Sequence, residues 1–322
     1  EWFPLVALGF LLRNYFLKVS QLDIDIRSMF LIDAAWVLAT AVLVAWAWVQ
    51  KTLVTADDMM IVSALSAIVS SLTGIALCAR RMQLARSIHR PELRQAITFG
   101  LAQCAAAATL VVQTQGDTLL LARFASMSVV GNYDVAKKFF RGFEAIRDAG
   151  AMFAYPAVAR LRAQGRTTEM VLMIEKMIGF TLVVVIPMVV IVWLAPIERI
   201  FGALYKSTFD QVPHIFRLLS LAALAIPFVL NLSVLTGLGD ARAGFRSTLI
   251  SSIVFVVAAL LFIPRLGADG AAIAVVASYV ALGIGSTIGV RRHVAFSLPG
   301  AIGRWRDAFD YAMRYWRRRT GK

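Results

Sequence analysis

One stretch of the chain carries charged side chains at a spacing that could hold an anionic ligand. Six of them recur at helical intervals: Asp134, Lys137, Lys138, Arg141, Glu144 and Asp148. At about 100° per residue, this spacing predicts a helix that groups the six charges in an arc of about 120°. Val135, Phe139, Phe143 and Ile146 fall on the opposite face, and Arg147 lies outside the polar arc. The chemistry open to this helix depends on whether it crosses a membrane or lies on one.

The composition predicts an integral membrane protein. Hydrophobic residues make up 59% of the 322-residue chain, and the mean hydropathy is +0.74. Charged residues make up 16%, against about 25% in soluble domains. The net charge of +14 would suggest nucleic acid in a soluble protein. In a membrane protein Lys and Arg gather in cytoplasmic loops instead, so we expect no nucleic-acid partner.

The cysteines and histidines predict neither a disulfide framework nor a metal site. Cys78 and Cys104 both lie in apolar stretches, and the three histidines are far apart in the sequence. We therefore expect no cofactor.

Apolar segments of the length that a bilayer requires predict an all-α, polytopic fold. We expect nine spans, at about residues 2–18, 29–50, 58–79, 94–123, 131–158, 171–194, 212–236, 245–263 and 270–290. The third has a face of small residues suited to close packing, formed by Ser63, Ser66, Ser70, Ser71 and Gly74. The fifth should end near Pro156. The segment between the sixth and seventh should be a loop or a short surface helix.

The distribution of Lys and Arg tests whether the charged helix crosses. If it crosses, the loops on one side and the C-terminal tail hold 21 basic residues, and the loops on the other side hold four. If it lies flat, the split becomes 10 against 15. Because basic residues concentrate on the cytoplasmic side, the count favours crossing and predicts a cytoplasmic C-terminus.

A crossing helix must shield its cations from lipid. Lys137, Lys138 and Arg141 would each cost about 2.5–3.5 kcal/mol if they faced lipid at the membrane centre. One interpretation is a hydrated cavity in which they contact an anionic ligand. The alternative is pairing along the helix, such as Asp134 with Lys138 and Glu144 with Lys137 or Arg141.

Several ordered segments carry a resemblance to a known family. They are GDTLLLARFASMSVVGNYDVAKKF, YPAVARL, ERIFGALYKSTFDQ, GLGDAR and IPRLGADGAAIAVV, and they fall within roughly residues 90–291. This series resembles the polysaccharide (O-antigen repeat-unit) flippases of the multidrug/oligosaccharidyl-lipid/polysaccharide exporter superfamily. Asp117, Gly131, Tyr133 and Ala136 match the family's Asp…Gly-x-Tyr-x-x-Ala pattern, and Gly202 and Tyr205 match its Phe-Gly…Tyr loop.

The resemblance implies about twelve helices in two lobes around a central cavity. It also implies transport of undecaprenyl-diphosphate-linked oligosaccharide across the bacterial inner membrane, from the cytoplasmic to the outer leaflet. On that pattern the chain would begin near the fourth helix. We then expect four parts: the remaining helices of the N-terminal lobe at 1–79, a basic cytoplasmic linker at 80–93, a six-helix C-terminal lobe at 94–291 and a basic cytoplasmic amphipathic tail at 292–322.

On this interpretation the protein is a transporter without catalytic residues, and its charged helix meets the lipid diphosphate. We expect the cargo to be contacted by four cations, Lys137, Lys138, Arg141 and Arg147. The candidate sugar contacts are Gln113 and Gln115, for which hydrogen bonds between helices are the alternative. The acidic side chains expected to hold the cations apart or to bind a coupling ion are Asp117, Asp134, Glu144 and Asp148.

Other interpretations of the function stay open. A drug exporter or a lipid II flippase would share the superfamily fold. A membrane glycosyltransferase or polymerase of the same pathway would usually need a large soluble loop with acidic or metal-binding residues. A truncated product without transport activity is a further reading. The tail at 299–319 is basic and amphipathic, so we expect it to bind anionic membrane lipids; docking to other polysaccharide-assembly membrane proteins is the alternative.

Overall fold

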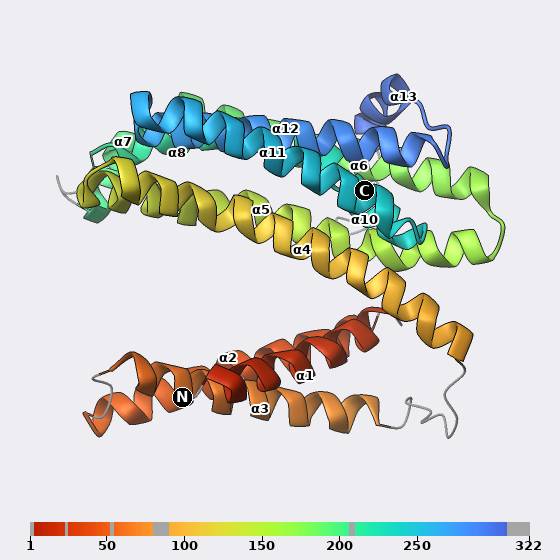
Figure 1. Ribbon diagram of the computed structural model, residues 1–322, viewed down its shortest axis with the longest axis horizontal. Coiled ribbons are helices and arrows are strands. Elements are labelled where there is room, and N and C mark those ends of the chain that lie inside the picture. The colour runs from red at the N-terminus through yellow and green to blue at the C-terminus, as the bar shows by residue number, and fades with distance from the viewer. Residues whose placement is uncertain (1–2, 23–24, 52–54, 80–89, 206–209, 308–322) are drawn as a thin grey trace, which may run out of the picture. The chain divides into compact units, whose positions relative to one another are not determined.

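The computed structural model describes the chain except residues 1–2, 23–24, 52–54, 80–89, 206–209 and 308–322. The regular secondary structure of the described residues is helical, as the composition predicts (Figure 1). The chain divides into two compact units, Glu1–His89 and Arg90–Lys322. This division falls inside the stretch 80–93 that we expected as a linker. Residues 80–89 lie outside the described residues, and residues 90–93 already belong to a helix.

In the first unit, the residues that the structure describes form a bundle of three helices, α1 (Phe3–Leu22), α2 (Ile26–Val49) and α3 (Ala56–Cys78). Its packing depends on the small-residue face of α3. A Cβ at Gly74 would lie 2.6 Å from the Cβ of Phe16, so α1 and α3 touch at a point that only glycine fits. Ser70 Oγ donates to the carbonyl of Ile32 at 2.7 Å, which ties α3 to α2. The predicted close packing of this face is therefore present.

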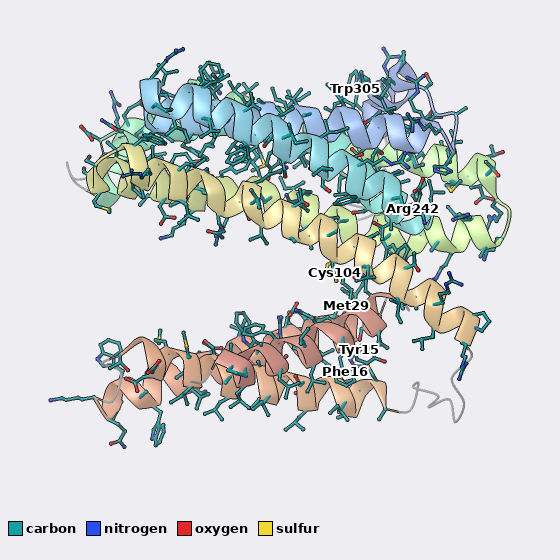
Figure 2. The ribbon with its side chains drawn as sticks, viewed as in Figure 1. Tyr15, Phe16, Met29, Cys104, Arg242 and Trp305 are labelled. Atoms are coloured by element: carbon teal, nitrogen blue, oxygen red, sulfur yellow. The ribbon has the colours of Figure 1, made fainter. Side chains whose placement is uncertain are left out.

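The described residues of the second unit form ten helices. They are α4 (Arg90–Phe124), α5 (Met127–Ala163), α6 (Thr167–Leu194), α7 (Ile197–Tyr205), α8 (Val212–Ala223), α9 (Ile226–Val229), α10 (Asn231–Gly237), α11 (Ala241–Leu266), α12 (Ala268–Arg291) and α13 (Leu298–Gly303). Helix α11 packs along α12 and α4, and α5 packs against α8 and α10. The short helix α13 packs on α6, and Trp305 follows it (Figure 2). The main core lies between α5, α8 and α12, around Tyr133, Phe143 and Leu219.

Two boundaries differ from the sequence-based expectation. Helix α5 continues through Pro156 to Ala163 instead of ending at the proline. The predicted seventh span is broken into α8, α9 and α10, with a bend of 45° between α8 and the α9–α10 segment. The amides of Leu224 and Ala225 bond three residues back rather than four, and Pro227 has no amide hydrogen to donate. These features explain the break.

The helices fit a multi-pass membrane protein. Six helices among the described residues are long and apolar enough to span a bilayer, and the bent α8–α10 segment would make a seventh. All nine predicted segments correspond to helices. However, α1 and α5 are not among the helices that are long and apolar enough to span a bilayer. Both carry charges within their length: Arg13 and Lys18 in α1, and in α5 the charged side chains between Asp134 and Asp148, which we call the charged row. Exposed apolar side chains such as Trp48 and Leu194 offer a lipid-facing surface.

We expect Gly270→Ala to destabilise the turn between α11 and α12. A Cβ at this position would lie 2.3 Å from the carbonyl oxygen of Phe262, which is backbone and cannot rotate away. The free energy of unfolding should fall by about 1–3 kcal/mol, measured by thermal unfolding in detergent. The control is Gly100→Ala, where a Cβ meets nothing within 4 Å; this helical position should gain up to about 1 kcal/mol. Equal stabilities of the two variants would contradict the close contact.

Candidate functional site

The charged row of α5 begins with a buried cluster shared with α4. Asp117 of α4 is fully buried. Its Oδ1 lies 2.6 Å from Lys137 Nζ, and its Oδ2 accepts a hydrogen bond of 2.7 Å from the Tyr133 hydroxyl. The amide of Thr118 donates to Oδ1 at 2.7 Å. Tyr133 and Lys137 are four residues apart, so one face of α5 presents both donors to the carboxylate.

This arrangement makes the pair of Asp117 and Lys137 part of the structure of the α4–α5 hairpin. A buried carboxylate without a partner is strongly unfavourable, and removing one member of such a pair typically costs 3–5 kcal/mol. Lys137 also donates to the carbonyl of Thr114, and its ammonium lies over the Tyr133 ring at 5.9 Å. Lys137 therefore has Asp117 as its acidic partner rather than Glu144, the partner considered from the sequence.

A second cluster lies further along α5 and reaches α12. Arg147 Nη2 lies 3.0 Å from Asp148 Oδ1, and Arg147 Nη1 lies 3.6 Å from Glu144 Oε1. The Tyr279 hydroxyl of α12 accepts from Arg147 Nη1 at 3.2 Å and donates to Glu144 Oε1. The Tyr279 ring packs edge-on against Phe140, with the ring centroids 5.7 Å apart. Arg147 thus joins Glu144 and Asp148, although it falls outside the predicted arc.

The remaining charged side chains of the predicted site differ in exposure and in whether they have a partner. Lys138 and Asp134 form an ion pair of 2.9 Å, in which the side chains are 65% and 46% exposed. Arg141 is exposed and has no hydrogen-bond or ion-pair partner among the described residues. Arg141 is therefore the cation of the row most available to a ligand.

The two glutamines have different surroundings. Gln113 is buried, and its amide nitrogen donates to Ser251 Oγ at 2.9 Å and Ser252 Oγ at 2.8 Å, both on α11. It has the interhelical role that we gave as the alternative to a sugar contact. Gln115 is exposed on α4, which suits a ligand contact better.

Sequence reasoning missed the tyrosine that links α5 to α12. Tyr279 lies 135 residues from Glu144, and no local spacing connects the two positions. Tyr133 entered only as part of a motif, although its spacing of four residues from Lys137 was a usable signal. The described residues contain no group of three or more His, Cys, Asp or Glu side chains that could hold a metal ion.

The arrangement can exchange partners with an anion. Arg147 and Lys138 each face a carboxylate. A phosphate oxygen carries the same sign of charge and could take the place of that carboxylate. Charge-assisted bonds from Arg and Lys to phosphate resemble those to carboxylate in length and strength. Reversible binding of an anionic group close to Arg141 is therefore the chemistry that we expect of this arrangement.

Comparisons with known proteins agree with this fold. A family model described as "Polysaccharide biosynthesis protein" matches residues 16–212. No curated protein matches the sequence. Among solved structures, a point mutant of a Vibrio cholerae MATE transporter aligns with a TM-score of 0.73 at 14% identity, over 91% of this chain and 69% of that one. A MATE point mutant aligns with a TM-score of 0.72 at 16% identity, over 88% of this chain and 65% of that one.

We expect Asp117→Asn to lower the free energy of unfolding by about 3–5 kcal/mol, because Lys137 would lose its buried counter-charge. The matched control is Asp134→Asn, which removes an exposed pair and should cost at most about 1 kcal/mol. Denaturation in detergent micelles measures both. The double variant Asp117→Asn/Lys137→Met should lose less than the sum of the two single losses. Additive losses would show that the two groups do not interact.

Proposed function

The chain belongs to the polysaccharide biosynthesis protein family, and from this premise we propose that it is part of a flippase for undecaprenyl-diphosphate-linked oligosaccharide. The cargo would move from the inner to the outer leaflet of the bacterial inner membrane, with the C-terminus of the chain in the cytoplasm. The chain spans 65% and 69% of the two MATE structures it resembles. The proposal therefore concerns the full-length transporter.

One observation carries this proposal: the exposed cation Arg141 lies between Lys137, Lys138 and Arg147, each of which is held by an acid. A lipid diphosphate must bring negative charge through a region of low dielectric constant, where a fixed cation lowers the barrier. Arg141 supplies such a charge without first giving up an ion pair among the described residues. A guanidinium also matches the geometry of phosphate oxygens.

The strength of each ion pair determines which other cations of the charged row could contact the diphosphate. Lys138 and Arg147 would join Arg141 on the diphosphate when Asp134, Glu144 and Asp148 release them. Lys137 is the least available cation, because Asp117 is buried and has no other basic partner among the described residues. Gln115 would contact the sugar, and Gln113 would hold α4 to α11.

Drug export is the second candidate, and the fold similarity to MATE transporters favours it. A cavity for cationic drugs should present uncompensated acids. On α5 the acidic side chains at 134, 144 and 148 each face a basic group instead. This balance favours an anionic cargo, which a lipid II flippase would also carry.

We expect Arg141→Ala to reduce polysaccharide export in cells by about tenfold or more, since a hydrogen bond to a charged group contributes about 1.5–3 kcal/mol. Arg141→Lys should retain much of the export, because the positive charge stays. The matched control is Arg123→Ala, which removes an exposed arginine near the end of α4 and should leave export unchanged. Wild-type export by Arg141→Ala would remove the main support for the proposal.

Cysteine accessibility distinguishes the possible cargoes. The full-length protein would carry Arg141→Cys, with Cys78 and Cys104 replaced, and would be treated with a charged, membrane-impermeant thiol reagent. Labelling that added lipid-diphosphate sugar reduces would support the flippase. Labelling that this lipid leaves unchanged would favour another substrate. Absence of labelling from either side of the membrane would place residue 141 outside a hydrated pathway.

A further inference from the structure

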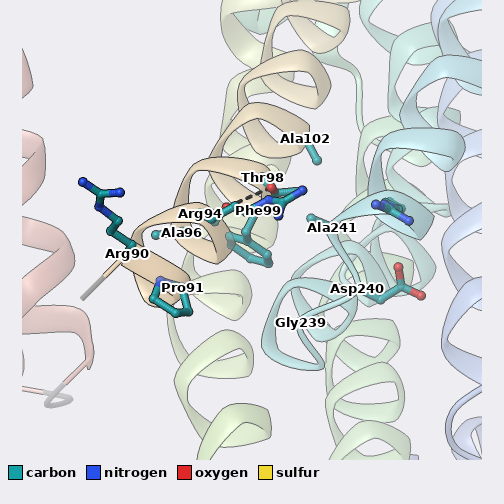
Figure 3. A pocket seen from close by; sticks show the side chains of 11 residues that line it. Arg90, Pro91, Arg94, Ala96, Thr98, Phe99, Ala102, Gly239, Asp240 and Ala241 are labelled. Atoms are coloured by element: carbon teal, nitrogen blue, oxygen red, sulfur yellow. Dashed lines mark hydrogen bonds between the residues drawn. The ribbon is translucent and has the colours of Figure 1, made fainter. Parts of the chain in front are cut away.

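A second basic site lies at the other end of α4, in a pocket of about 980 Å³. It is lined by the first turns of α4 and by the turn between α10 and α11, including Arg90, Arg94, Phe99, Asp240 and Arg242 (Figure 3). Arg94 precedes Asp117 by 23 residues along α4. At 1.5 Å per residue, Arg94 is therefore about 34 Å along α4 from Asp117. Along α5, Arg162 at the rim of the pocket lies 14 residues, or about 20 Å, beyond Asp148, which is the near end of the charged row. It is a separate site.

Arginines from α4 and α11 line the pocket, and an arginine of α5 lies beside one of its lining residues. Arg94 comes from α4, and Arg242 lies on the first turn of α11 (Figure 2). Arg162 of α5 reaches the rim: its Nη1 lies 3.1 Å from the place that a Cβ at Gly239 would occupy. None of the three has an ion-pair partner among the described residues. Arg90 also lines the pocket, but its side chain points away from the rest of the lining (Figure 3).

Among the described residues that line this pocket, the one carboxylate is already engaged. Asp240 caps α11 by accepting from the Ala243 amide at 2.9 Å, and it lies 2.8 Å from His293 Nε2. Partial burial would raise the pKa of Asp240, but the Ala243 amide and His293 outweigh it and lower the pKa. Asp240 therefore stays charged and bound to its own partners. It leaves the arginines free for an anion from outside.

The position of the pocket along the helices indicates the type of anion. The candidate spans begin at Ala96 in α4 and at Ala241 in α11. Arg90 and Arg94 precede the apolar span, whereas Phe99 and Ala102 of the same pocket lie within it. The pocket thus has a basic part at the membrane surface and an apolar part below it. A lipid has the matching order, with its phosphate at the surface and its chains below.

We propose that this pocket binds the phosphate group of a membrane lipid, with Arg94, Arg162 and Arg242 around the phosphate and Phe99 against the start of the chain. Paired guanidinium groups suit a phosphate because each can donate two parallel hydrogen bonds. The start of α11 adds the positive end of its helix dipole. The phosphate can belong to an anionic phospholipid or to a polyprenyl diphosphate, and the chemistry of recognition is the same.

The test measures lipid binding to the full-length protein in nanodiscs of phosphatidylcholine. The probes are short-chain phosphatidylglycerol and farnesyl diphosphate, and all variants carry Arg141→Ala, which removes the most available cation of the charged row of α5. We expect Arg94→Gln/Arg242→Gln to weaken binding of at least one probe tenfold or more. Arg265→Gln, an exposed arginine at the far end of α11, should bind as the parent does. Arg94→Lys/Arg242→Lys should recover part of the affinity.

The outcomes separate the two sources and the two proposals. Tighter binding of farnesyl diphosphate would identify a diphosphate lipid, and tighter binding of phosphatidylglycerol would identify a phospholipid. Unchanged affinity of Arg94→Gln/Arg242→Gln for both probes would overturn the proposal, as would an equal loss in Arg265→Gln. If the double variant fails to fold, the two single variants give the same comparison. Because the background lacks Arg141, a failure of the flippase proposal would leave this result unchanged.

Discussion

The pairing of Asp117 with Lys137 and Tyr133 fixes the geometry on which the charged helix depends. A carboxylate with no exposure must face its partners, so α5 can take only one rotation about its axis relative to α4. That rotation turns Ala136, Phe140 and Phe143 into the core beside Tyr133. It also leaves Arg141, one turn beyond Lys137, on the exposed side. The buried acid of the site thus determines on which side of α5 the exposed Arg141 lies.

A second contact holds the other part of α5. Glu144 and Arg147 meet Tyr279 of α12, and the Tyr279 ring rests on Phe140. The polar cluster and the aromatic core therefore share one side chain. Because α12 also packs along α11, which contacts α4, the orientation of α5 is tied to the α11–α12 pair. Two cross-helix contacts, one at each end of the row, keep the charged helix in register while its middle stays accessible.

The sequence was sufficient for those features that depend on local spacing. The helical segments, the small-residue face of α3 and the ion pair of Asp134 with Lys138 all follow from periodicity. The partner of Lys137 and the role of Tyr279 did not, because those contacts join positions 20 and 135 residues apart. The predicted end of the fifth span near Pro156 was wrong. A proline usually ends a helix in water, whereas in a membrane protein neighbouring groups satisfy the freed carbonyl.

The ion pairs of the charged row differ in burial. The cations of the row therefore differ in how readily they could leave their acids and contact a ligand. A fixed positive charge in a spanning helix is unfavourable without a ligand, and each acid along the row reduces that cost in the unloaded protein. On the proposed function, such an acid must also release its partner when the diphosphate of the cargo binds. The exposed pair of Asp134 and Lys138 can do this at little cost, and the partly buried Arg147 requires more. Asp117 cannot release Lys137 without becoming a bare buried charge. A ligand should therefore engage Arg141 first, then Lys138 and Arg147, while Lys137 keeps the hairpin together throughout.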